Sequence, residues 1–202
     1  MKEVHIIGCG GHGRVLAEAA YASGMKVVAF WDDRESTWGT ELMGIPIRGP
    51  IQSIAEIPDA QAIIAIGDNR SRKRIADSLP TVQWANIIHP FTTLARDVQL
   101  ETGIVICAGV VVQPGAKIAA HAILNTSCSV DHDCKIGRYS QISPGCHLAG
   151  GVIVGEGAML GTGCSVIPLR TIGDWSIVGA GGAVVRDVPT GSKVLGVPAK
   201  PL

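Results

Sequence analysis

A six-residue repeat between Leu94 and Val184 constrains the fold of this 202-residue chain more than any other feature. Starting from Leu94, every sixth residue is aliphatic, and the register holds over sixteen consecutive positions. Four residues after each aliphatic the side chain is small or slim, with Arg170 as the exception. Chance does not keep one residue class in phase for so long, so the stretch is an internal repeat.

A period of six excludes the commonest repeating structures. An amphipathic helix repeats its apolar positions at three and four residues, and glycines stand here where they would weaken a helix. Short flat strands, one to each hexad and separated by corners, fit the period instead. The repeat therefore predicts a parallel β-helix.

Several hexads begin with an aliphatic residue followed directly by glycine. These are Ile136-Gly137, Val154-Gly155, Leu160-Gly161, Ile172-Gly173 and Val178-Gly179. The pattern resembles the hexapeptide-repeat acyltransferases, which implies a left-handed β-helix with three hexads to each triangular coil. By this resemblance Leu94 to Ala183 forms five coils, with the aliphatic residues inward. The second and third residues after each aliphatic then lie at an outward corner.

The first 89 residues carry a different pattern, in which apolar strands alternate with helices. The predicted strands and helices are Lys2–Ile7, Arg14–Ser23, Met25–Phe30, Ala62–Ile66, Arg70–Leu79 and a short strand over Trp84–Ile88. Such alternation is typical of a parallel α/β sheet, here a Rossmann-like half-domain. The proline of His89-Pro90 places the boundary, so we expect domains over 1–89 and 90–202. After Val184 the register fails at Thr190, and the tail is expected to cap the β-helix or contact a neighbour.

A glycine-rich turn follows the first strand. Gly8, Gly10 and Gly13 match the G-x-G-x-x-G pattern, and Asp32-Asp33 follows about twenty residues on, where a ribose hydroxyl can be bound. We favour a nucleotide site over the alternative that the glycines only allow a tight turn and close helix packing. An NAD-dependent dehydrogenase is least favoured, because the chain has a β-helix in place of a second nucleotide-binding half.

Composition excludes several classes of partner. The 17 basic and 17 acidic side chains balance, which gives no reason to expect nucleic acid or an anionic membrane surface. No stretch is long and apolar enough to span a membrane, and no secretory signal precedes the first strand, so we expect a cytoplasmic protein.

The six cysteines do not have the spacing of a metal site or a disulfide framework. Cys128, Cys134, Cys146 and Cys164 all fall on the small inward position of their hexads, where sulfur packs as a small hydrophobe. We therefore predict reduced core cysteines and no metal.

Among the six histidines, His132 is the strongest candidate for proton transfer. It lies two residues past Val130, at a predicted corner, between Asp131 and Asp133. We expect a corner histidine to face solvent or a neighbouring subunit, and His121 also falls at a corner. An imidazole there can accept a proton near neutral pH, and a carboxylate on its other nitrogen fixes the tautomer. From the residues alone, a general base and an ordinary solvated corner both remain open.

The segment Asn125–Gly137 resembles the catalytic segment of bacterial sugar acetyltransferases, namely the UDP-4-amino-sugar N-acetyltransferases and the related sialic acid O-acetyltransferases. The glycine-rich turn, Asp32-Asp33 and Ala65–Asn69 also fit that family, so the resemblance covers essentially the whole chain. It implies an acetyl-CoA-dependent enzyme that assembles as a homotrimer with active sites between subunits.

The resemblance also implies roles for particular positions. The family's general base falls on His132, and the acidic residue that raises its basicity, usually glutamate, is Asp133. A histidine that contacts the acetyl group in the amino-sugar enzymes is replaced by Gln141. The cofactor-contact positions are Gln141, Gly150, Thr162 and Ala180. The nucleotide-sugar positions are Gly10, Gly11, His12, Asp32, Asp33 and Gly67.

These assignments lead to three hypotheses. The first is N-acetylation of a nucleotide-linked amino-sugar by direct transfer from acetyl-CoA, with His132 as general base and Gln141 or backbone N–H groups stabilising the oxyanion. The second is O-acetylation of a sialic acid or related sugar, which would use the same base. The third is a non-catalytic β-helix scaffold, in which His132 has no chemical role.

Overall fold

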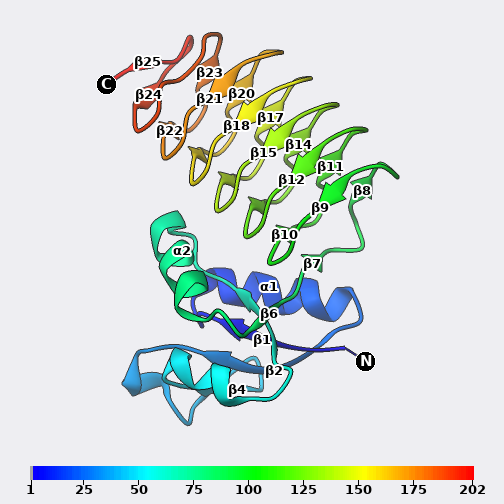
Figure 1. Cartoon of the computed structure of the whole chain (residues 1–202), viewed down its shortest axis with the longest axis vertical. Helices are drawn as coiled ribbons and strands as arrows, with labels where there is room; N and C mark the ends of the chain where they lie inside the picture. Colours follow the sequence, from blue (N-terminus) through cyan, green and yellow to red (C-terminus); the bar gives the residue numbers. More distant parts are fainter. Residues whose placement is uncertain (1) are drawn as a thin grey trace. The chain divides into compact units, whose positions relative to one another are not determined.

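The computed structural model describes residues 2–202, which form two compact units divided between Pro90 and Phe91. The first unit is an α/β domain and the second is a β-helix (Figure 1). Within the described part of the chain, no helix has the length and apolar character needed to cross a membrane.

The first unit is built on a six-stranded sheet in the order β3-β4-β2-β1-β5-β6. Its strands are β1 (Glu3–Ile7), β2 (Lys26–Trp31), β3 (Glu41–Leu42), β4 (Ile45–Arg48), β5 (Gln61–Ile64) and β6 (Gln83–Trp84). All neighbouring pairs are parallel except β3 with β4. After a polar first residue, the central strands β1, β2 and β5 are mainly apolar and buried, as expected for a parallel sheet covered on both faces.

Two α-helices and two 3₁₀ segments complete this unit. They are α1 (Gly11–Ala22), α2 (Asn69–Ser78), η1 (Glu35–Thr37) and η2 (Ile51–Glu56). The predicted alternation of strand and helix is confirmed, but α1 begins at Gly11 and not at Arg14. The predicted strand Trp84–Ile88 is wrong as a single element, because it divides into β6 and β7 (Ile87–Ile88). The hairpin of β3 and β4 was not predicted, since neither strand shows a long apolar run.

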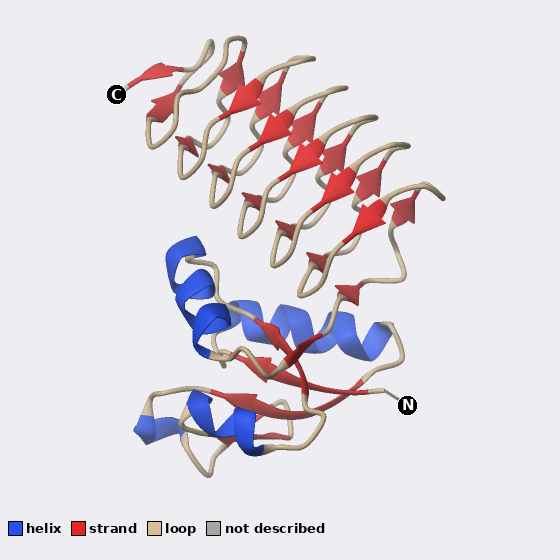
Figure 2. Ribbon diagram, viewed as in Figure 1, coloured by secondary structure: helices blue, strands red, loops and turns tan. Residues whose placement is uncertain are grey.

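The second unit is a left-handed β-helix with three flat faces (Figure 2). Within this unit, the parallel strands of the first face are β10 (Val105–Ile106), β13 (Ile123–Leu124), β16 (Gln141–Ile142), β19 (Met159–Leu160), β22 (Ile177–Val178) and β24 (Lys193–Leu195). The second consists of β8 (Thr93–Leu94), β11 (Val111–Val112), β14 (Ser129–Val130), β17 (His147–Leu148), β20 (Ser165–Val166) and β23 (Ala183–Val184). The third consists of β9 (Gln99–Leu100), β12 (Lys117–Ile118), β15 (Lys135–Ile136), β18 (Ile153–Val154) and β21 (Thr171–Ile172).

The strands stack in parallel with a register of eighteen residues, for example Leu124 on Ile142 and Ile142 on Leu160. The predicted inward aliphatics form the core, and each of these three is fully buried. The fold prediction, including three hexads per coil, is confirmed.

The corners repeat a single backbone conformation. From Gly103 to Gly181, every sixth residue has a positive φ between 55° and 75°. Glycine occupies most of these positions, because a side chain is strained there. Six corners nevertheless carry a side chain: His121, Ser127, Asp133, Tyr139, Leu169 and Trp175.

The tail continues the β-helix with a shorter coil. Val188 bridges to Ile172 and Val194 pairs with Val178, each sixteen residues on instead of eighteen. The loss of register at Thr190 therefore marks a coil shortened by two residues. The chain then turns back, and β25 (Lys200–Pro201) pairs antiparallel with β24, so the tail does cap the first face.

Candidate active site

His132 and Asp133 form a hydrogen-bonded pair on the corner between β14 and β15. Nδ1 of His132 lies 2.9 Å from Oδ2 of Asp133, and both side chains are exposed in the single chain. The other flanking carboxylate has a different partner, since Oδ1 of Asp131 accepts the backbone N–H of His132 at 2.8 Å. Asp133 therefore contacts the ring and Asp131 holds the backbone.

This arrangement leaves Nε2 of His132 as the proton acceptor. Because Asp133 accepts from Nδ1, the neutral ring carries its lone pair on Nε2, which makes no hydrogen bond within residues 2–202. The hydrogen bond that His132 donates to Asp133, together with the negative charges of Asp131 and Asp133, raises the pKa of His132 above its ordinary value. The imidazolium that forms on proton uptake is thereby stabilised.

We expect Asp133→Asn to shift the pH profile of catalysis. The substitution removes the charge that raises the pKa of His132, so that pKa falls and the acid limb of kcat/KM moves to lower pH. The plateau also falls, because a weaker base removes the proton. Asn tolerates the positive φ of 59° at this corner, so the backbone is kept. An acid limb that stays in place in a pH–rate series would contradict the pairing.

Gly150, one coil above, provides the space in which the imidazole lies. A Cβ built on Gly150 would clash with Nε2 and Cε1 of His132. Residues larger than glycine therefore cannot occupy position 150 while the ring keeps its place. The resemblance assigned Gly150 to the cofactor, and the structure places it against the imidazole of His132.

Gly150→Ala should reduce kcat roughly ten- to hundredfold with little loss of folding stability, because the exposed imidazole can swing away from the new methyl group. In a His132→Ala background the same substitution should have no further effect on kcat. Steady-state kinetics of the two single variants and the double variant test this. An effect of Gly150→Ala that persists without the imidazole would mean that Gly150 acts elsewhere.

The remaining predicted cofactor positions lie on other parts of the β-helix. Gln141 lies on the first face, and Thr162 and Ala180 lie at the corner between the first and second faces. His132 lies at the corner between the second and third faces, so one β-helix does not bring these residues together. Oε1 of Gln141 is buried without a hydrogen-bond partner, although the residue is only half-buried.

Of two further predictions about the cysteines and histidines, one is confirmed and one is wrong. All six cysteines are reduced and buried, as predicted, and burial raises the pKa of Cys107 to about 11. The rule that a corner histidine must be exposed is wrong for His121, which is only 3% exposed. Its ring stacks on Tyr139 with the centroids 5.1 Å apart, and Gly103 leaves room on the other side. A corner position alone therefore does not identify an accessible imidazole.

In the first unit, the glycine-rich turn leads directly into α1. Gly10 is the N-cap and supplies no side-chain cap, so Gly11, His12 and Gly13 form the first turn of the helix. The first N–H groups of a helix lack partners within it and favour anions. Burial, followed by the nearby charge of Arg72, lowers the pKa of His12 to about 4, and its buried Nε2 has no hydrogen-bond partner. His12 is therefore neutral at physiological pH.

Asp32 and Asp33 have partners within the first unit. Oδ1 of Asp33 accepts the backbone N–H of Ile51 at 2.8 Å. Asp32 accepts hydrogen bonds from the backbone and thiol of Cys9 and from Arg34. Burial raises the pKa of Asp32, but these hydrogen bonds outweigh burial and hold it well below its ordinary value.

The turn that contains Gly67 depends on a residue that sequence reasoning missed. Arg72 of α2 is 1% exposed and donates to the carbonyl oxygens of Ile66 (2.9 Å) and Gly67 (3.4 Å) and to Oδ1 of Asn69 (2.8 Å). No sequence signal distinguishes Arg72 from its exposed neighbours Arg70 and Arg74. Its burial is decided by the way α2 packs on β5.

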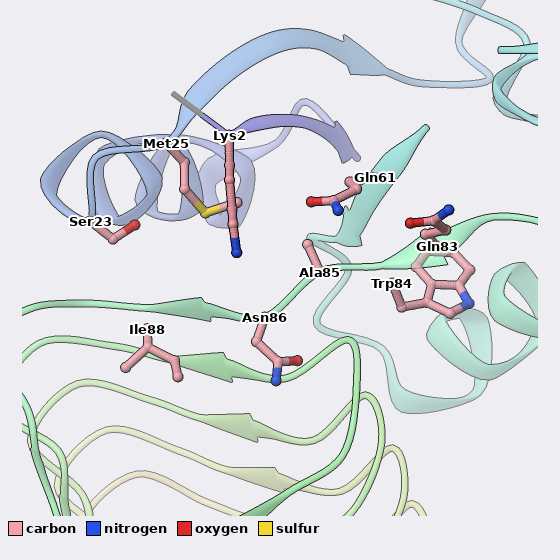
Figure 3. Close-up of a pocket in the computed structure, with 9 residues that line it drawn as sticks. All are labelled: Lys2, Ser23, Met25, Gln61, Gln83, Trp84, Ala85, Asn86 and Ile88. Carbon is pink, nitrogen blue, oxygen red and sulfur yellow. The ribbon is translucent and has the colours of Figure 1, made fainter. Parts of the chain in front are cut away.

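A pocket of about 430 Å³ lies in the first unit, away from the glycine-rich turn (Figure 3). Lys2, Met25 and Gln61 line it at the amino ends of β1, β2 and β5, and Gln83, Trp84 and Asn86 add polar and aromatic side chains. The glycine-rich turn follows the carboxyl end of β1, which is the edge where α/β sheets bind their ligands. None of the predicted substrate residues lines this pocket.

Two family models match the chain, the "PglD N-terminal domain" over residues 3–79 and "Bacterial transferase hexapeptide (six repeats)" over residues 133–168. A curated relative, UDP-N-acetylbacillosamine N-acetyltransferase of Bacillus subtilis, is 40% identical over 113 residues. That alignment covers 54% of this chain and 52% of the relative, so the chain spans about half the length of this curated relative.

Two solved structures match over nearly their whole length. The perosamine N-acetyltransferase PerB of Caulobacter crescentus, solved with CoA and GDP-perosamine, is 39% identical with a TM-score of 0.93, covering 100% of this chain and 98% of its own. The acetyltransferase domain of PglB from Neisseria gonorrhoeae, solved with acetyl coenzyme A, is 36% identical with a TM-score of 0.94, covering 100% and 99%.

Both units therefore match one kind of enzyme from end to end, at more than a third sequence identity. The chain belongs to the PglD-like nucleotide-amino-sugar N-acetyltransferases of the hexapeptide-repeat superfamily.

Proposed function

We propose that the protein transfers an acetyl group from acetyl-CoA to the amino group of a nucleotide-linked amino-sugar. The observation that carries this proposal is the His132–Asp133 pair, which leaves Nε2 available at an outward corner. The relatives solved with CoA, acetyl coenzyme A and GDP-perosamine support the two substrates. Two relatives are named N-acetyltransferases, one of perosamine and one of UDP-N-acetylbacillosamine, which favours an amine acceptor over the hydroxyl of a sialic acid.

In the proposed mechanism the amine attacks the thioester carbonyl directly. Nε2 of His132 takes a proton from the attacking nitrogen as the new C–N bond forms, and CoA leaves as its thiolate when the C–S bond breaks. Asp133 stabilises the imidazolium. The six cysteines are buried, so none of them can serve as an acyl carrier. The substrate's nucleotide is proposed to bind near Gly10, Gly11, His12 and Gly67, together with Asp33.

We further propose that the active site is shared between copies of the chain. Thr162 and Ala180 lie at a different corner of the β-helix from His132, so acetyl-CoA held by both corners must bridge two copies. A closed three-fold assembly meets this requirement. Sedimentation equilibrium should give three times the chain mass, and a monomer that is fully active would contradict the shared site.

The proposal is tested by presenting acetyl-CoA with UDP- and GDP-linked amino-sugars and with free sialic acids. Thiol release from CoA and product mass are measured together, because thioester hydrolysis also releases thiol. Transfer to an amino-sugar nucleotide, with a product heavier by one acetyl group, supports the proposal. Transfer to sialic acid alone would support O-acetylation, and no transfer to any acceptor would favour a scaffold.

A further inference from the structure

The loop that follows β2 places an arginine beside the glycine-rich turn. Arg34 is the N-cap of η1, and its side chain is 62% exposed. Its guanidinium donates from Nε to Oδ1 of Asp32 at 2.9 Å, and from Nη2 to Sγ of Cys9 at 3.0 Å. Because Cys9 belongs to the turn, the guanidinium lies against the turn itself.

These contacts occupy the carboxylate that would otherwise bind a ribose. Oδ1 of Asp32 accepts from the backbone N–H and Nε of Arg34. Oδ2 accepts from the backbone N–H and thiol of Cys9 and from Nη2 of Arg34. The two oxygens of Asp32 together accept five hydrogen bonds, so this carboxylate has little capacity left for a ligand hydroxyl.

The groups left available around the turn are hydrogen-bond donors. Nη1 of Arg34 has no partner within residues 2–202, and α1 begins without a side-chain cap. The negative charge of Asp32 is balanced by Arg34 at close range. A planar guanidinium beside free backbone N–H groups suits a phosphate better than a neutral hydroxyl.

We propose that Arg34 binds a phosphate oxygen of the substrate's nucleoside diphosphate, and that Asp32 is a positioning residue that holds Arg34 in place. The inference rests on the proposed function for its ligand, and it assigns the nucleotide contact to a residue outside the expected Asp32-Asp33 pair. Lysine at position 34 would keep the positive charge. It would lose the planar guanidinium, whose several N–H groups can bind Asp32 and the ligand at the same time.

The test is calorimetric binding of UDP and of GDP, without CoA or sugar, to the wild-type chain and its variants. Arg34→Ala should weaken binding of the preferred nucleotide roughly ten- to hundredfold, and Arg34→Lys should weaken it less. Lys26→Ala is the matched control, because Lys26 also pairs with an exposed carboxylate but lies at the opposite end of β2. It should bind nucleotide as the wild type does.

A double variant separates a direct contact from charge balance. If Arg34 only neutralises Asp32, then Asp32→Asn combined with Arg34→Ala restores wild-type affinity, and the proposal is overturned. If Arg34 contacts the phosphate, the double variant stays weak. Equal binding by Arg34→Ala and Lys26→Ala, or no nucleotide binding by the wild type, also overturns the proposal. Should Arg34→Ala fail to fold, as judged by circular dichroism, Arg34→Lys decides, and wild-type affinity in that variant counts against the contact.

Kinetics give an independent readout. Arg34→Ala should raise KM for the amino-sugar nucleotide and leave both KM for acetyl-CoA and kcat at saturating acceptor near wild type. Because nucleotide binding is measured without turnover, the two proposals can fail separately. A chain that binds UDP through Arg34 but acetylates no amino-sugar would refute the proposed reaction and leave this inference standing.

Discussion

We expect His132→Ala to abolish most of the acetyltransferase activity, with kcat lower by about 10²- to 10⁴-fold. In the proposed mechanism the imidazole receives the proton, and its Nε2 has no competing partner within the described chain. The side chain is exposed and contributes nothing to the core, so folding should be unchanged. Initial rates at saturating acetyl-CoA measure the loss, and circular dichroism confirms the fold.

His147→Ala is the matched control for this experiment. His147 is also an exposed histidine of the β-helix, and its Nδ1 lies 2.9 Å from Oγ of Ser129 on the neighbouring strand. Its removal should leave kcat near the wild-type value. If His132→Ala retained comparable activity, proton transfer by the corner imidazole would be excluded, and another group would have to accept the proton.

Arg72→Met should destabilise the first unit by about 3–5 kcal/mol. Methionine preserves much of the side-chain volume but leaves the buried amide oxygen of Asn69 and the partly buried carbonyl oxygens of Ile66 and Gly67 without this donor. An unsatisfied buried acceptor costs about 1–3 kcal/mol, and the two carbonyl oxygens add less because water reaches them in part. Urea denaturation followed by tryptophan fluorescence reports mainly on this unit, which contains Trp31, Trp38 and Trp84, while Trp175 belongs to the β-helix.

Arg74→Met provides the comparison on the same helix. Arg74 is exposed, and within residues 2–202 its side chain donates a single hydrogen bond, to Oγ of Ser71. Its replacement should therefore change the free energy of unfolding by less than about 0.5 kcal/mol. Similar urea midpoints for Arg72→Met and Arg74→Met would mean that the buried guanidinium of Arg72 does not hold the turn at Gly67. A β-helix that unfolds together with the first unit in Arg72→Met would show that the two units are coupled in folding.

The β-helix was predictable in detail because its sequence pattern and its geometry share one period. Each hexad places one aliphatic residue inward, so the faces, the corners and the buried positions of Cys128, Cys134, Cys146 and Cys164 follow from counting. The shortened last coil escaped prediction because its two missing residues shift the aliphatics Val188 and Val194 out of phase.

The sites were only partly predictable, because hydrogen-bond partners depend on side-chain positions that spacing does not determine. His132 was identified by its corner, but nothing in the sequence separates the roles of Asp131 and Asp133. His121 also lies at a corner, at the hexad position that Asp133 occupies, and is nevertheless buried, since Tyr139 stacks on it from the next coil. Arg34 was not predicted as a site residue, because the sequence does not distinguish it from the other surface arginines. Only the folded chain brings its guanidinium against Asp32 and Cys9.

The antiparallel return of β25 has a consequence for how far the stack can grow. A parallel ladder ends in a row of unpaired N–H and C=O groups that can template another molecule's strand. On the first face, β25 covers the outer edge of β24 and runs in the opposite direction to every strand beneath it. An incoming coil would therefore meet a mismatched edge, and end-to-end addition of molecules into a fibre is disfavoured on that face.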